Sequence, residues 1–105
     1  MPVSSSIVAY TDCFEHFEQA MSAGTGIRIE CPDRGQAKLL QTRLHYARTL
    51  DRRRNAEIFP EDSPNYNVSD FDVLVATMQE VSGKWYVYLK KRFASTKVEE
   101  LPADG

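Results

Sequence analysis

The sequence predicts an α+β domain, a two-layer sandwich in which two helices cover one face of a mostly antiparallel sheet. Three observations predict this fold class: two amphipathic segments with helical spacing, an alternating strand between them, and two strand-like segments joined by Ser82-Gly83. The expected order is β-α-β-α-β-β, where the first strand rests only on the short apolar run at residues 7–10. We expect one domain over residues 1–97 and a fraying acidic tail over residues 98–105.

The first helix follows from Phe14, Phe17 and Met21, which recur at spacings of three and four residues. Asp12 and Glu15 have the spacing of a capping box, and two glycines follow the pattern, so we expect a helix of about 11 residues. Residues 27–31 alternate apolar and charged side chains and predict a half-buried strand.

A long second helix is predicted to begin at Arg34, because Asp33 and Gln36 form a second capping-box pattern. Neither Gly nor Pro interrupts residues 36–59, so the helix should reach about Arg54. Residues 55–70 contain two prolines and read as an irregular acidic loop.

Residues 71–81 and 85–93 are rich in β-branched and aromatic side chains and should form a hairpin about Ser82-Gly83. This turn places Val81 opposite Lys84 and Gln79 opposite Tyr86. One face then carries Met78, Val87, Ala76, Leu89, Leu74 and Trp85, while the other carries Tyr86, Tyr88, Thr77, Gln79, Val73, Val75, Lys84, Lys90 and Arg92.

The composition excludes disorder, since 42% of the residues are hydrophobic and 27% are charged. The net charge of −2 hides segregation along the chain. Residues 34–54 contain seven cationic side chains and one acid, residues 55–83 contain six acids and neither Lys nor Arg, and residues 84–97 contain five cations. The basic blocks either converge on a polyanion or are neutralised by the acidic segment on folding.

On a helical projection of residues 34–54, one continuous polar ridge carries Lys38, Gln41, His45, Arg48 and Arg52. Such a ridge can follow a phosphate backbone, although most polar helix faces are simply solvated. Arg43 projects to the apolar half and should pair with a carboxylate, for which the segment 57–72 is the nearest supply, or mark an oligomer interface. Asp51 and Arg54 are three residues apart and should pair in solvent.

Tyrosines beside cations on an open sheet face suit single-stranded nucleic acid, because bases stack on the rings while Lys and Arg meet phosphates. The same tyrosines suit a protein interface or a plain solvated face. The helix ridge and the sheet face with Tyr86 and Tyr88 can lie on different sides of the molecule, in which case a ligand would have to wrap around an edge or a dimer would have to bring the two surfaces together.

No catalytic motif is present. Cys13, His16, Cys31 and His45 lack the spacing of a zinc site. The strand that follows Asp70 and Asp72 lacks the acid that a metal-dependent nuclease places there two residues from a lysine. We therefore expect no enzyme, metal or cofactor. The first ten residues resemble no secretory signal and no apolar run spans a membrane, which predicts a cytoplasmic protein with reduced cysteines.

The leading hypothesis is a small nucleic-acid-binding protein. The alternative is a protein-interaction module, a homodimer or an inhibitor, that buries the face of Tyr86 and Tyr88. The residues expected to contact nucleic acid are Arg34, Lys38, His45, Arg48, Arg52, Arg53, Lys84, Tyr86, Tyr88, Lys90 and Arg92.

Overall fold

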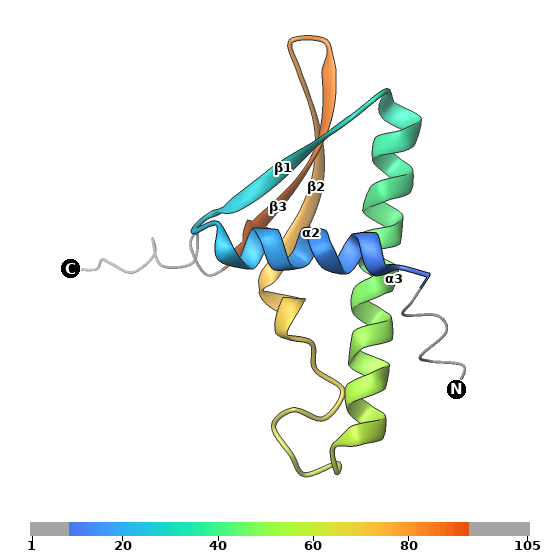
Figure 1. The fold of residues 1–105 in the computed structure, drawn as a ribbon, viewed down its shortest axis with the longest axis vertical. Coiled ribbons are helices and arrows are strands. Elements are labelled where there is room, and N and C mark those ends of the chain that lie inside the picture. The colour runs from blue at the N-terminus through green and yellow to red at the C-terminus, as the bar shows by residue number, and fades with distance from the viewer. Residues whose placement is uncertain (1–8, 93–105) are drawn as a thin grey trace, which may run out of the picture.

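Within the residues that the structure describes, two helices pack on one face of a three-stranded antiparallel sheet, which confirms the α+β class (Figure 1). This computed structural model describes residues 9–92, so residues 7 and 8 of the expected first strand and the tail 98–105 lie outside the described residues, while residues 9 and 10 form a turn before the first described helix. The elements are α2 (Thr11–Ser22), β1 (Gly26–Cys31), α3 (Arg34–Ile58), the 3-10 turn η1 (Asp70–Val73), β2 (Leu74–Val81) and β3 (Lys84–Lys91). The strand order is β1-β3-β2, so β3 is central.

The core lies between the sheet and the helices. Alternation along the strands turns one set of side chains toward α2 and α3, and Val87 and Leu89 of the central strand are fully buried there. Phe17 of α2 stacks on Phe71 of η1 with ring centroids 4.8 Å apart. The buried apolar residues around them are Cys13, Ala20, Cys31, Ala37, Leu44, Ala47, Leu74 and Ala76.

Helix α2 has close to its expected length but not its expected start. Its N-cap is Tyr10, which makes no side-chain capping bond, so the capping box expected from Asp12 and Glu15 is wrong. Asp12 instead pairs with Arg43 of α3 at 2.7 Å. The prediction that Arg43 pairs with a carboxylate is confirmed, but the partner comes from α2 rather than from the segment 57–72.

Helix α3 begins as expected, since Asp33 caps it by accepting a hydrogen bond from the Gln36 amide at 2.9 Å. It continues past Arg54 to Ile58. Its 25 residues span about 37 Å, and its last turns extend below the sheet, where the segment 59–69 folds back beside them (Figure 1). The Asn55 side chain donates to the Val68 carbonyl across this contact.

Asp51 and Arg54 are paired as expected, but Asp51 is not in solvent. The residue is only 2% exposed, and its carboxylate also accepts a hydrogen bond from the Ser69 hydroxyl at 2.6 Å. A buried carboxylate is costly unless it is paired and hydrogen-bonded, so Arg54 and Ser69 together stabilise this charge, and the bond from Ser69 holds the 59–69 segment against α3.

The register of the hairpin is confirmed throughout, with Val81 opposite Lys84 and Gln79 opposite Tyr86. Ser82 and Gly83 have φ values of 53° and 81°, which is the left-handed geometry of a two-residue hairpin turn. Strand β2 begins at Leu74, not at residue 71, because residues 70–73 form the η1 turn that Ser69 caps. Asp70 and Asp72 therefore lie in this turn and do not open a strand.

We predict that Gly26→Ala is far more damaging than Gly24→Ala, although both glycines have positive φ. A Cβ at Gly26 would lie 2.1 Å from the Leu89 carbonyl oxygen, so β1 would have to move off β3, whereas a Cβ at Gly24 meets nothing within 4 Å. We expect a loss of at least about 3 kcal/mol of unfolding free energy at Gly26 and about 1 kcal/mol at Gly24. Urea unfolding followed by Trp85 fluorescence measures both, and equal losses would contradict the packing argument.

Candidate functional site

The polar ridge of α3 does not face solvent along its whole length: its middle lies against the edge strand β2. Gln41 donates to the Ala76 carbonyl at 3.0 Å, and Arg48 donates to the Leu74 carbonyl and, at 3.3 Å, to the Phe71 carbonyl. These are backbone groups on the side of β2 that has no neighbouring strand. The two helix side chains therefore satisfy part of an otherwise open sheet edge.

Arg48 is the centre of an internal charge network. Its residue exposure is 9%, and its guanidinium lies 3.8 Å from the Asp72 carboxylate. Arg52 donates to the same carboxylate oxygen at 2.8 and 2.6 Å. Burial and the neighbouring Arg52 lower the pKa of Arg48. The two guanidinium groups are thus held by the protein itself, and we leave both out of the candidate nucleic-acid interface.

Asp72 stays ionised despite its partial burial. Burial alone would raise its pKa, but hydrogen bonds from Arg52 and from the Ser69 amide outweigh that effect and lower it. Asp72 therefore serves as the counter-ion of Arg48 and Arg52. A metal-binding role for Asp70 and Asp72 gains no support, and among residues 9–92 there is no cluster of three or more His, Cys, Asp or Glu side chains that could hold a metal ion.

The remaining ridge residues do not form one positive surface. Partial burial and the nearby Arg48 and Lys38 lower the pKa of His45, whose Nδ1 lies 3.2 Å from an Arg48 nitrogen. Lys38 and Arg53 are exposed. Arg34, which lies with its guanidinium carbon 5.9 Å from the Trp85 ring, is about 28 Å along the helix from Arg53. The cations of α3 are therefore scattered.

The other face of the sheet has a denser arrangement of aromatic and cationic side chains. Tyr86 and Tyr88 lie side by side on β3 with ring centroids 6.2 Å apart. Arg28 of β1 stacks over Tyr86 at 4.1 Å and donates to the Tyr88 hydroxyl at 3.4 Å. Lys90 lies 5.1 Å from the Tyr88 ring. We call these four residues the tyrosine face.

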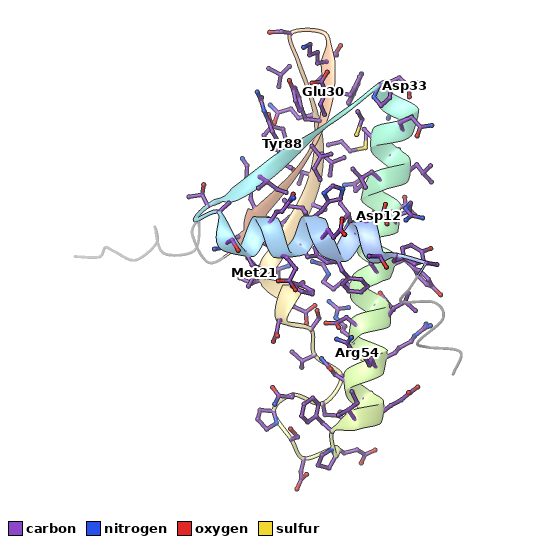
Figure 2. The ribbon with its side chains drawn as sticks, viewed as in Figure 1. Asp12, Met21, Glu30, Asp33, Arg54 and Tyr88 are labelled. Atoms are coloured by element: carbon purple, nitrogen blue, oxygen red, sulfur yellow. The ribbon has the colours of Figure 1, made fainter. Side chains whose placement is uncertain are left out.

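The tyrosine face is uncovered, because α2 and α3 pack against the opposite side of the sheet, and both tyrosines are only half-buried (Figure 1). Its charge is positive. Within residues 9–92, neither Arg28 nor Lys90 lies within 4 Å of a carboxylate. Glu30 lies nearer the hairpin turn, 3.8 Å from Lys84, and its more distant charge is the smallest of the causes that raise the pKa of Arg28. Figure 2 labels Tyr88 and Glu30 on the sheet, well apart from Arg54 near the end of α3.

Of the residues expected from sequence to contact nucleic acid, the structure gathers Tyr86, Tyr88 and Lys90 on an uncovered surface, with Lys84 partly neutralised by Glu30 beside them. His45, Arg48 and Arg52 also lie together, but at the contact between α3 and β2. Arg92 follows β3 and lies close enough to Arg48 to lower the pKa of that residue. Arg28 was missed. Its place on the polar side of an alternating strand was visible, but only the β1-β3 pairing, which sets Arg28 opposite Tyr88, brings it to the tyrosines.

Burial controls the ionisation of the two cysteines. Burial, followed by the charge of Asp12, raises the pKa of the Cys13 thiol to about 11, so it is uncharged near neutral pH. Burial also raises the pKa of Cys31. Both cysteines pack in the core as free thiols.

The chain matches no family model, no curated protein and no solved structure. Over residues 9–92, neither helix combines the length and the apolar character that crossing a bilayer requires.

We predict that Asp72→Asn destabilises the protein at pH 7 by about 1–3 kcal/mol, because it leaves the buried Arg48 without a counter-ion. The pKa of Asp72 is lower in the folded than in the unfolded chain, so its contribution is present above its ordinary pKa near 3.8 and is lost as the pH falls through the folded value. The difference in unfolding free energy between wild type and variant should shrink below pH 4.

Urea unfolding at a series of pH values measures this difference. Asp62→Asn, in the exposed loop after α3, is the matched control and should behave as the wild type. A wild-type advantage over Asp72→Asn that is the same at pH 3 and pH 7 would contradict the assignment of Asp72 as the counter-ion.

Proposed function

We propose that the protein binds single-stranded nucleic acid on the tyrosine face. The observation that carries the proposal is the pair of adjacent, half-exposed tyrosines flanked by two cations that have no carboxylate partner among residues 9–92. Bases stack on aromatic rings and on guanidinium planes, and cations beside the rings meet phosphates. Arg28, which both stacks on Tyr86 and reaches Tyr88, suits either contact.

The distribution of charge supports this orientation. Exposed acidic side chains gather elsewhere, around α2 and the loop after α3, where Glu18 and Asp70 line one cleft and Glu61 and Asp62 lie nearby in the chain. A polyanion approaching the molecule is therefore favoured on the sheet side and disfavoured on the loop side. A single strand also fits the site better than a duplex, because only unpaired bases present their ring faces to a flat sheet.

We predict that the double variant Tyr86→Leu, Tyr88→Leu weakens binding of a fluorescent single-stranded oligonucleotide. Each base that loses its stacking partner costs about 1–3 kcal/mol. The matched control Tyr86→Phe, Tyr88→Phe keeps both rings and should bind nearly as the wild type. Fluorescence anisotropy measures the affinities, and circular dichroism confirms that the variants fold.

Binding should also weaken steeply as the salt concentration rises. The logarithm of the association constant should fall linearly with the logarithm of the salt concentration, with a slope of about −0.7 for each phosphate contact to a single strand. The proposal is wrong if the wild type shows no salt-dependent binding to DNA or RNA strands. Light scattering that shows a dimer lost in the leucine variant and kept in the phenylalanine variant would instead favour a protein interface on the tyrosine face.

A further inference from the structure

One end of the tyrosine face is hollowed. A hollow of about 390 Å³ opens where β1 begins, at the end of the sheet away from the hairpin turn. We call it the Gly26 hollow, and it is lined by Thr25, Gly26, Ile27, Arg28, Tyr88 and Lys90. This volume is within the range of small-molecule sites in proteins.

Gly26 lines the hollow with its backbone alone. Gly26 pairs with Lys90 across the strands and shares a face with Arg28, two residues along β1. Its backbone lies so close to β3 that a Cβ would contact the Leu89 carbonyl oxygen and the Lys90 Cα at 2.1 and 2.9 Å. The surface between the Arg28 and Lys90 side chains is therefore bare backbone.

The lining of the hollow carries two positive charges and no acid. Arg28 and Lys90 have no carboxylate partner among residues 9–92, in contrast to Arg43, Arg48, Arg52, Arg54 and Lys84, each of which lies within 4 Å of a carboxylate. The Tyr88 hydroxyl, which accepts a bond from Arg28, has a proton of its own to donate.

We propose that the Gly26 hollow is a subsite for a doubly charged phosphate monoester. A monoester carries a charge of about −1.5 to −2 at neutral pH, which two cations balance, whereas each internal phosphate of a strand carries a single charge. The ligand is the phosphorylated end of a bound strand or a free mononucleotide. The inference rests on the proposed function, because it assigns one subsite of the same face.

The test compares fluorescent single strands that differ only in a terminal phosphate, at the 5′ or the 3′ end, with strands that end in hydroxyl groups. The phosphorylated strand should bind about tenfold more tightly, as expected for hydrogen bonds to a charged group. Arg28→Gln and Lys90→Gln should each remove most of that advantage. Arg53→Gln, an exposed cation of α3 outside the tyrosine face, should retain it.

Two further arms separate the sources of the ligand and the role of charge. Calorimetric titration with a mononucleotide tests the free ligand in the wild type and in Arg28→Gln. The advantage of the phosphorylated strand should decline as the pH falls below about 6, where the monoester takes up its second proton.

Equal affinity for phosphorylated and hydroxyl-ended strands would overturn the subsite and leave the proposed function standing. If no strand binds, the proposed function is wrong, and the mononucleotide then decides. Binding of the mononucleotide that is lost in Arg28→Gln would support a subsite for the free nucleotide, and an absence of such binding would overturn the inference.

Discussion

The contact of Arg48 with the edge of β2 holds the two layers in register. The guanidinium of Arg48 in α3 donates to backbone carbonyls where η1 meets β2. Asp72, which lies in η1, balances its charge. A long helix can slide or rotate on a sheet when only apolar side chains meet, because apolar contacts have no direction. The hydrogen bonds of Arg48 and Gln41 are directional, and they fix α3 along the edge strand.

That placement decides which surface remains for a ligand. With α2 and α3 on one side, Tyr86 and Tyr88 lie on the bare side of the sheet. Arg48 and Arg52 pair with Asp72 within the fold, whereas Arg28 and Lys90 on the bare side lie within 4 Å of no carboxylate among residues 9–92. The overall charge of −2 therefore gives no indication of this face, because it averages an acidic loop side with a positive sheet side.

Features that depend on residues close together in the sequence could be predicted, whereas features that depend on distant residues could not. The hairpin register depends on a two-residue turn and on alternation, both local, and every pair expected across it is present. The predicted ends of the helices were less accurate: Asp12 has the spacing of an N-cap residue, but its carboxylate pairs with Arg43 instead. The burial of Arg48 against β2 could not be predicted from a helical projection, because the projection gives the angle of a side chain around the helix axis but not its neighbours. The place of Arg28 beside the tyrosines depends on the strand order, which is a long-range property that no local pattern of this sequence indicates.

The overhang of α3 has a consequence for cooperativity. The longest strands span about 26 Å, whereas α3 spans about 37 Å. The C-terminal end of α3 therefore extends past the sheet and packs beside the 59–69 segment instead. That end is held by a few polar contacts, chiefly those of Asp51 and Asn55. Amide hydrogens of the last two turns should exchange through local opening, whereas those of β3, paired on both sides, should exchange only when the whole domain unfolds.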